Sequence, residues 1–403
     1  MNENPVKKLQ ALGQSVWLDN LSRNLLNSGQ LKKWVDSGVT GITSNPTIFQ
    51  KALAGSRDYD DSLRVFLAKG IRDDRELFFH LAIEDISRAA DLLWPVYEAT
   101  GGRDGYVSIE VSPDLAYDSE KTIAEAKHLF STIGKKNILI KVPATPQGVP
   151  AIEKLTADGV NVNVTLLFSV KRYEEIAWAY IRALEKRSAR GLPIGGIASV
   201  ASFFVSRVDT LIDKLLETRQ ASSRSEAEKS KLKSLLGQAA VANARVAYQK
   251  YREIFGGPRF RDLKGARIQR ILWGSTGTKN PAYSDVKYVD ELFELSSHKA
   301  HFRWFGIADS KVQQNLTIIL EPNLFDPQIA MWGVYPDQSR NRLIFTGNGE
   351  KGVGMPLSDW GFEFSENMPQ DILDAILKAR GDGDSTLEDE EYRKRLQDKF
   401  GNR

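Results

Sequence analysis

Seven short apolar runs, separated by longer amphipathic stretches, constrain the fold of this chain more than any other feature. The runs are rich in β-branched residues and cover residues 15–19, 41–44, 106–110, 137–141, 161–165, 197–203 and 270–275. Between them, apolar residues recur at helical spacing, for example over residues 76–97, 122–133, 170–187 and 237–255. Strands separated by helices imply parallel pairing through crossover connections, which predicts the α/β class.

The ends of these runs distinguish a closed barrel from an open sheet. Each run ends at, or one or two residues from, a polar or ionisable residue: Asp19, Asn45, Glu110, Lys141, Thr165, Ser202 and Ser275. In an open sheet the ligand lies at one switch point, to which only a few strands contribute. In a (β/α)8 barrel every strand delivers its last residues to one central mouth. We therefore predict a (β/α)8 TIM barrel, although a single polar residue at a strand end also marks the start of many loops.

The pattern changes after residue 296. Residues 1–296 are expected to form the barrel with strands one to seven. Residues 297–360 combine aromatic and β-branched runs with Pro, Asn and Gly turn signals, which predicts a β-rich unit inserted or appended near the C-terminus. Residues 361–403 are expected to supply the eighth strand, at "GFEFSEN" (361–367), and the C-terminal helices.

Composition excludes several classes of protein. The 403 residues are 41% hydrophobic and 27% charged, as in ordinary globular enzymes, and no apolar run approaches the roughly 20 residues that span a bilayer. A net charge of +3 gives no reason to expect a nucleic-acid partner. The absence of cysteine excludes disulfides and thiolate catalysis, and no histidine pair has zinc-motif spacing. We expect a cytoplasmic protein with no membrane segment, no metal and no cofactor.

Lys141 stands inside an apolar run, "ILIKVP", at the end of a predicted strand. On a barrel strand its side chain would enter the mouth, where apolar neighbours disfavour a charged ammonium. A neutral amine can attack a ketone, and the resulting protonated imine accepts electrons when a neighbouring carbon–carbon bond breaks. The alternative is a lysine that extends its ammonium to solvent.

Imine chemistry requires acids and bases within hydrogen-bond reach of the amine. Glu110 and Asp19 end other strands of the same predicted mouth, and Thr165 is suited to hold a water between Glu110 and the imine. The alternative for two carboxylates beside a lysine is a structural ion-pair cluster.

Two segments are candidates for binding phosphate. "WGSTGTKNPAY" (273–283) offers hydroxyls, glycine backbone and Lys279 after the seventh strand, where barrels commonly hold phosphate, and "SFFVSR" supplies Arg207. Residues 347–352 match G-x-G-x-x-G, but proline and glycine follow where a helix should begin, so dinucleotide binding is not expected.

Several long segments resemble the transaldolases in their longer bacterial form. These are "SVWLDNLSRNLLNSG", "GITSNPTIFQKA", "SIEVSP", "IKVPATPQGVPAIEKL", "NVNVTLLFSVKRYEEIAWAYI", "SVASFFVSRVDTLID" and "STGTKNPAYSDVKYVDEL", in the family's order over about residues 8 to 293. The resemblance implies a Schiff-base barrel enzyme that needs no cofactor. It would move a dihydroxyacetone unit from sedoheptulose 7-phosphate to glyceraldehyde 3-phosphate in the pentose phosphate pathway, giving erythrose 4-phosphate and fructose 6-phosphate.

The resemblance also implies roles for individual residues. Lys141 would form the imine, Glu110 and Thr165 would serve the water and proton steps, and Asp19 would be the acid and base of the carbon–carbon step. Asn45 and Asn163 would bind substrate hydroxyls, and Phe204 would line the pocket. The phosphate end would be bound by a further set: Ser202, Arg207, Ser275 and Lys279. Lys279 belongs to this set because shorter members carry an arginine two residues after the serine matching Ser275, where this chain has Gly277.

Two other functions remain open at this stage. A Schiff-base lyase like fructose-6-phosphate aldolase would release free dihydroxyacetone instead of transferring it. A non-catalytic sugar-phosphate binding protein is a different class, but it has no need of a buried amine with proton-transfer partners. Sugar phosphates are the expected small-molecule partners in each case, and the sequence does not indicate an oligomeric state.

Overall fold

Seven parallel strands form the centre of the molecule in the computed structural model, which describes residues 4–293 and 316–319. They are β1 (Ser15–Asp19), β2 (Val39–Thr43), β3 (Tyr106–Glu110), β4 (Ile138–Pro143), β5 (Val162–Leu167), β6 (Ser199–Phe204) and β7 (Arg270–Gly274). Each strand pairs in parallel with the next along the chain. The α/β class is confirmed, and the seven predicted runs match the seven strands to within about two residues.

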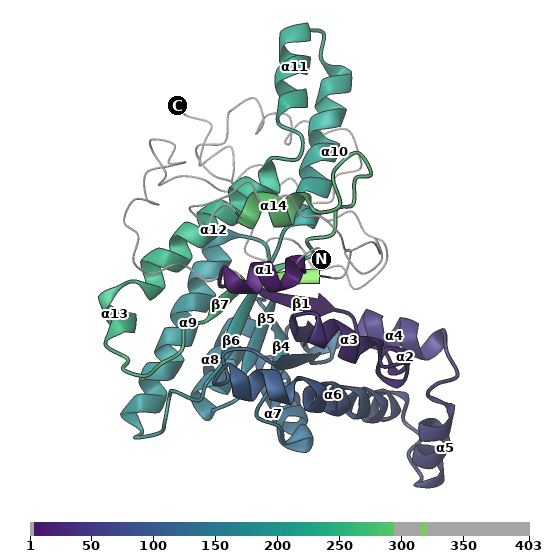
Figure 1. Ribbon diagram of the computed structural model, residues 1–403. Helices are drawn as coiled ribbons and strands as arrows, with labels where there is room; N and C mark the ends of the chain where they lie inside the picture. The colour runs from purple at the N-terminus through teal and green to yellow at the C-terminus, as the bar shows by residue number, and fades with distance from the viewer. Residues whose placement is uncertain (1–3, 294–315, 320–403) are drawn as a thin grey trace.

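Helices surround this curled sheet (Figure 1). They are α1 (Pro5–Ala11), α2 (Arg23–Asn27), α3 (Gln30–Asp36), α4 (Pro46–Ala54), α5 (Asp60–Ala68), α6 (Asp74–Ala99), the 3-10 turn η1 (Pro113–Leu115), α7 (Ser119–Ile133), α8 (Gly148–Asp158), α9 (Val170–Ala189), α10 (Ser206–Ser222), α11 (Glu226–Ser234), α12 (Ala239–Phe255), α13 (Pro258–Arg261) and α14 (Lys287–Phe293). Several begin at side-chain caps. Asp73, Asp118 and Ser169 accept hydrogen bonds from backbone N–H groups three residues ahead, which would otherwise lack partners.

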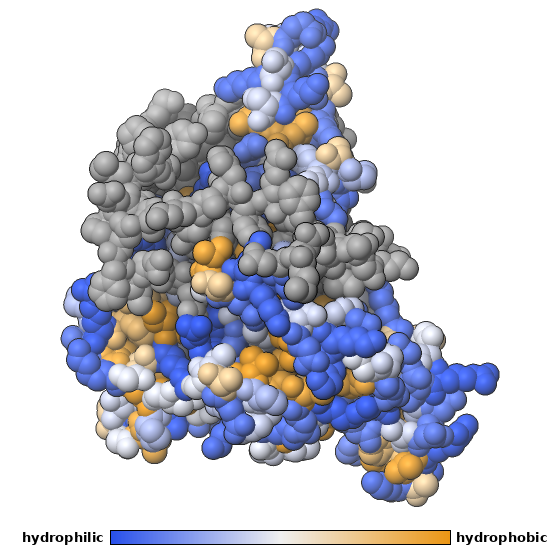
Figure 2. Space-filling model, viewed as in Figure 1, coloured by the Kyte–Doolittle hydropathy of each residue, from blue (hydrophilic) through white to orange (hydrophobic). Residues whose placement is uncertain are grey.

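Helices α10 and α11 form an arm that projects from the rest of the molecule (Figure 1). Its surface is mostly hydrophilic, with apolar side chains near its base (Figure 2). This distribution fits a pair of helices that pack on each other and meet the barrel only at one end. No helix within the described part of the chain is long and apolar enough to cross a membrane.

A short strand, β8 (Leu316–Ile319), closes the sheet by pairing antiparallel with both β1 and β7. These residues fall within the predicted β-rich unit 297–360, whereas the eighth strand was expected at 361–367. Residues 361–367 lie outside the described residues, as do 361–403 as a whole and all of 297–360 apart from β8. In the described structure the place between β7 and β1 is therefore taken by a different segment, which runs in the opposite direction.

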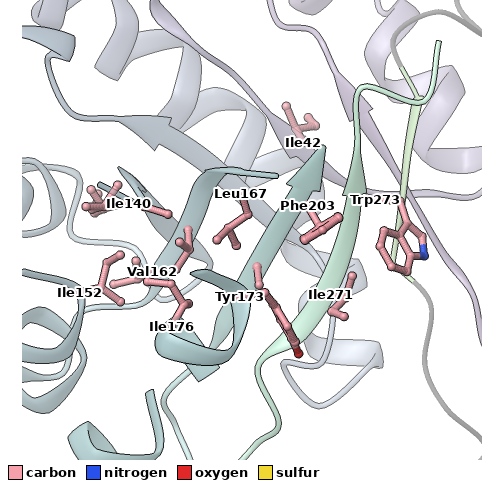
Figure 3. Close-up of a cluster of buried hydrophobic side chains, with 14 of the residues drawn as sticks. Ile42, Ile140, Ile152, Val162, Leu167, Tyr173, Ile176, Phe203, Ile271 and Trp273 are labelled. Atoms are coloured by element: carbon pink, nitrogen blue, oxygen red, sulfur yellow. The ribbon is translucent and has the colours of Figure 1, made fainter. Parts of the chain in front are cut away.

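The outward faces of the strands pack on the helices. Figure 3 shows Ile140, Val162 and Phe203 of the sheet near Ile152 of α8 and Tyr173 of α9. The ring of Phe203 meets Tyr173 edge-on, with centroids 6.4 Å apart, and meets Trp273 of β7 at 5.9 Å. Strands buried on both faces need continuous apolar runs, which is why these strands were recognisable in the sequence.

The inward faces form two layers. An apolar layer near the amino ends of the strands consists of Trp17, Tyr106, Leu139, Ala198, Val200 and Leu272. Its largest member, Trp17, requires Gly41 in the neighbouring strand, because a Cβ at Gly41 would lie 2.3 Å from the indole. Since side chains alternate between faces, residues two further along each strand form the next layer, at the carboxyl ends. That second layer is polar.

Candidate active site

Lys141 lies in the polar layer, on β4, with its side chain 6% exposed. Its Nζ donates a hydrogen bond of 3.0 Å to the backbone oxygen of Ser44 and lies 3.5 Å from Oε2 of Glu110. The amine therefore stays inside the barrel and does not extend to solvent. Leu139, two residues earlier on the same face, closes the space beneath it.

Glu110 ends β3 directly beside Lys141, with which it is paired in register. Burial raises the pKa of Glu110 above its usual range; the nearby Lys141 acts to lower it and the charge of Asp19 adds to the rise. A carboxyl with a raised pKa keeps its proton closer to neutral pH and can both give and take one there. This arrangement differs from a surface ion pair, in which the carboxylate is stabilised.

Asp19 ends β1 and faces the same interior. The hydroxyl of Thr43, its register partner on β2, donates a 2.6 Å hydrogen bond to Asp19 Oδ1. Oδ2 has no hydrogen-bond partner among the described residues. One carboxylate oxygen is thus fixed by the protein, and the other is left to meet a bound molecule.

Asn163 is completely buried on β5 and is paired in register with Lys141. Its Nδ2 donates to Ser108 Oγ at 3.0 Å, and its Oδ1 accepts from Ser202 Oγ at 2.7 Å. One donor and one acceptor fix which way the amide points. Ser202 was expected at the phosphate end, whereas here its hydroxyl holds Asn163. Ser108 was not identified from sequence, although it lies on the same strand face as Glu110, two residues away.

Thr165 is 1% exposed at the end of β5, and its register partner is Pro143 on the lysine strand. Its hydroxyl makes no hydrogen bond to another described residue, so it is available to a water or a substrate. The next residue, Leu166, has φ of +60°, and the pairing with β6 shifts register here. The backbone after Thr165 is therefore held in an unusual conformation, of the kind that concentrates at functional sites.

Asn45 lies at the start of α4, beyond the end of β2. Its Oδ1 accepts a 3.0 Å hydrogen bond from the backbone N–H of Ile48 and caps the helix. Its Nδ2 has no partner in the described residues and can donate to a ligand hydroxyl. The residue is partly exposed, at the rim of the mouth.

Positive charge gathers on the other side of the mouth, where β6 and β7 end. Arg207, the second residue of α10, is exposed, and its guanidinium lies 5.8 Å from the ring centre of Phe204. Partial burial and the charge of Arg207 lower the pKa of Lys279, while Asp19 acts to raise it. Two neighbouring cations produce a positive potential that suits a phosphate group.

The loop after β7 is tied to α10 at its first residue. Ser275 has φ of +54°; its backbone oxygen accepts from the N–H of Ser206 at 3.1 Å, and the two hydroxyls are 2.9 Å apart. Gly274 precedes it because a Cβ there would lie 2.5 Å from the ring of Phe204. Phe204 is therefore fixed between β7 and Phe168, whose ring it meets edge-on at 5.1 Å.

The predicted site residues thus form two groups on the same end of the barrel. An inner group lies on strand ends around the amine: Asp19, Glu110, Lys141, Asn163, Thr165 and Ser202. A rim group lies at the last residue of β6, Phe204, and on the loops and helix starts that follow the strands: Asn45, Arg207, Ser275 and Lys279. Asp19 of the inner group acts to raise the pKa of Lys279 in the rim group, so the two groups are close enough to interact electrostatically.

Neither described histidine belongs to these groups. His80 lies on α6, where it stacks on Phe66 with ring centres 4.8 Å apart, and His128 lies on α7. Among residues 4–293, no cluster of three or more His, Cys, Asp or Glu side chains has the geometry to hold a metal ion. His298 and His301 lie outside the described residues, as does the G-x-G-x-x-G match at 347–352.

Comparison with known proteins connects this geometry to one family. A family model described as transaldolase/fructose-6-phosphate aldolase matches residues 16–297. A protein named Transaldolase from Trichodesmium erythraeum is 44% identical over 363 residues, which is 86% of this chain and 93% of that protein. Transaldolase 2 from Nostoc punctiforme is 48% identical over 296 residues, 72% of this chain and 77% of that protein. A Transaldolase from Saccharopolyspora erythraea is 48% identical over 290 residues, 71% and 76% respectively.

Proposed function

The chain belongs to the transaldolase/fructose-6-phosphate aldolase family, and from that premise we propose that it is a transferase that carries a dihydroxyacetone unit on Lys141. The donor would be sedoheptulose 7-phosphate and the acceptor glyceraldehyde 3-phosphate, giving erythrose 4-phosphate and fructose 6-phosphate in the pentose phosphate pathway, in the cytoplasm. The observation that carries the proposal is a buried amine 3.5 Å from a carboxyl whose pKa is raised by burial.

The first half of the reaction forms the imine. The neutral amine of Lys141 attacks the ketone carbon of the donor, and the resulting carbinolamine loses water once its hydroxyl has been protonated. Glu110 is suited to supply and then recover that proton, because its raised pKa keeps it protonated nearer to neutral pH. Thr165 offers a hydroxyl without a described partner to hold the water between them.

The second half breaks and remakes a carbon–carbon bond. Asp19 removes the proton from the hydroxyl beyond the bond that breaks, the bonding electrons move into the iminium, and erythrose 4-phosphate leaves as the aldehyde. The enamine that remains attacks the aldehyde carbon of glyceraldehyde 3-phosphate, and Asp19 returns the proton to the new hydroxyl. Addition of water to the new iminium, the reverse of the first half with Glu110 as proton carrier, then releases fructose 6-phosphate and restores the amine of Lys141. Oδ2 of Asp19 is suited to this exchange, since Thr43 already engages Oδ1.

Substrate recognition divides between the two groups of residues. Asn45 and Asn163 would bind hydroxyls, Ser202 would hold the amide of Asn163 in place, and Phe204 would line the pocket. The phosphate would be bound by Arg207, Ser275 and Lys279. For the fold, we propose a TIM-type barrel with an inserted or appended β-rich unit at 297–360, whose strand β8 pairs antiparallel with β1 and β7.

Trapping the imine tests this proposal. The protein is incubated with fructose 6-phosphate and borohydride, and the added mass is located by peptide mass spectrometry. We expect a dihydroxyacetone-sized adduct on Lys141 and none on Lys279, which serves as an internal control. No adduct in protein shown to be folded would favour the non-catalytic binding protein. Cleavage of fructose 6-phosphate without an aldehyde acceptor would identify a lyase.

A further inference from the structure

The two rim cations belong to different elements, so something must keep them together. Arg207 starts α10, whereas Lys279 lies in the loop that follows β7. Arg207 lowers the pKa of Lys279, which means that the two positive charges repel each other. Keeping two like charges close costs electrostatic free energy, so contacts that fix the loop favour their proximity, and with it phosphate affinity.

Helix α10 also carries two aspartates, one turn apart, that face the loop. Asp213 is 5% exposed; its Oδ2 accepts from the hydroxyl of Tyr283 at 2.7 Å. Asp209 is 1% exposed and its Oδ2 accepts from the hydroxyl of Tyr288 at 2.8 Å. Positions four apart lie on one face of a helix, so both tyrosines are tied to the helix that bears Arg207.

The other oxygens of these aspartates fix the turn before α12. Oδ1 of Asp213 accepts from the backbone N–H of Gly237 at 2.8 Å, and Oδ1 of Asp209 accepts from that of Ala240 at 2.7 Å. Gly237 has φ of +70°, and a Cβ there would lie 2.9 Å from Cζ of Tyr283. The ring of Tyr283 therefore packs on the turn at Gly237, and its hydroxyl binds Asp213 on α10. Both the ring and the hydroxyl of the tyrosine are fixed in position.

We propose that Asp213 and Tyr283 are positioning residues that hold the loop 275–283 on α10 and so keep Lys279 beside Arg207 for the phosphate of the substrate. The inference rests on the proposed function only in taking a sugar phosphate as the ligand. Ser206 and Ser275 secure the first residue of the loop, and Tyr283 secures its last, with Lys279 between them. Neither residue touches the amine or its proton-transfer partners, which are held by β1 and β3 to β5.

Tyr283→Phe removes only the hydroxyl that reaches Asp213. We expect the Kd for inorganic phosphate, measured by calorimetry, and the KM for fructose 6-phosphate to rise about tenfold, the effect of losing one hydrogen bond to a charged group. The kcat should change by less than about twofold, since the reaction centre is separate. Tyr180→Phe is the matched control: it also loses one buried hydroxyl bond of 2.7 Å, to the backbone oxygen of Arg267 at the opposite end of the barrel.

Two further variants separate positioning from general stability. Asp213→Asn keeps an oxygen for the N–H of Gly237 and offers an N–H to the hydroxyl of Tyr283, so phosphate affinity should stay within about twofold of wild type. A double-mutant cycle combines Tyr283→Phe with Lys279→Gln, a substitution at an exposed residue that should not affect folding. Tyr283→Phe should weaken phosphate binding much less in the Lys279→Gln background than in the wild type, because it acts through Lys279.

Each outcome decides the inference. Unchanged phosphate affinity in Tyr283→Phe, equal loss in Tyr180→Phe, additive losses in the cycle, or a wild type that does not bind phosphate would each overturn it. A Tyr283-dependent phosphate site in a protein that forms no borohydride adduct would support the positioning role while refuting the proposed transferase, so the two failures are distinguishable.

Discussion

Replacing Arg23 with methionine should lower the free energy of unfolding by about 3–5 kcal/mol, the usual cost of leaving one partner of a buried ion pair alone. Arg23 is 6% exposed at the start of α2, and its Nε donates to Oδ1 of Asp85 at 2.9 Å. Asp85, on α6, is completely buried, so water cannot replace the lost donor. This contact holds the segment that follows β1 against α6, because Arg23 lies only four residues after Asp19.

The expected loss of unfolding free energy depends on which contacts remain after Arg23→Met. Methionine keeps the packing of the arginine stem, whose guanidinium lies 4.5 Å from the ring centre of Tyr59. Tyr59 still donates to Oδ2 of Asp85 at 2.8 Å, which leaves Oδ1 unpaired. The second ion pair of Arg23, with Glu84, adds little, because the Glu84 side chain is 40% exposed and such pairs contribute about 0–1 kcal/mol.

Urea unfolding of three variants, each compared with the wild type, measures these changes in the free energy of unfolding. Arg23→Met should lose the full amount, Glu84→Gln less than about 1 kcal/mol, and the double variant Arg23→Met/Asp85→Leu should recover most of the loss because no charge is left buried. A loss of unfolding free energy below about 1 kcal/mol in Arg23→Met would refute the argument, since a buried carboxylate without a partner costs more than that.

The dependence on pH provides a second check. Burial raises the pKa of Asp85 even though Tyr59 and Arg23 act to lower it, and removing Arg23 must raise it further. An acid whose pKa is higher in the folded state binds its proton more tightly there, so stability falls as pH rises above the unfolded value of about 3.9. The deficit of Arg23→Met should therefore shrink toward low pH. A deficit that is independent of pH would exclude Asp85 as its source.

Three further predictions concern the site and the outer helices. Lys141→Ala should abolish carbon–carbon exchange and the borohydride adduct while the circular dichroism spectrum is retained, and substantial residual turnover would contradict the proposed role. Ser202→Ala should lower kcat/KM about tenfold, because Asn163 loses the donor that orients its amide, whereas Ser199→Ala on the same strand should not; equal effects would point to the strand itself. Burial raises the pKa of Asp158, but lysines on α7 and α8 outweigh it and lower the pKa to about 2. Asp158→Asn should therefore cost about 1–2 kcal/mol near pH 7, and this cost should shrink as pH falls from about 4 through about 2, as acid denaturation would show.

The inner group of the site could be predicted from sequence because a strand alternates strictly between two faces. Once the seven runs are parallel neighbours, the last inward residue of each must meet the others at the carboxyl end. Register then places Glu110 beside Lys141 and Lys141 beside Asn163. The apolar neighbours that made Lys141 conspicuous are the outward residues of the same strand, together with Leu139 beneath the amine.

The partners that orient these side chains could not be predicted in the same way. Thr43, Ser44 and Ser108 look like ordinary polar residues at strand ends, and each acts on a group between 24 and 97 residues away. Such contacts depend on small differences in the positions of side-chain atoms on neighbouring strands, which no periodic pattern encodes. Ser202 shows the consequence: the resemblance implies a role at the phosphate end, and no motif indicates that its hydroxyl also donates to Asn163.

The antiparallel pairing of β8 could not be predicted for a different reason. Strands one to seven were recognised because each is followed by a helix, and 361–367 was chosen as the eighth on that same basis. An antiparallel strand needs no helical crossover, so β8 carries no such signal. A strand between β1 and β7 only has to pair the N–H and C=O groups on the open edges of those two strands. The four residues Leu316–Ile319 provide this pairing. All the proposed site residues come from β1 to β7 and the segments that follow them, so none of them lies on β8.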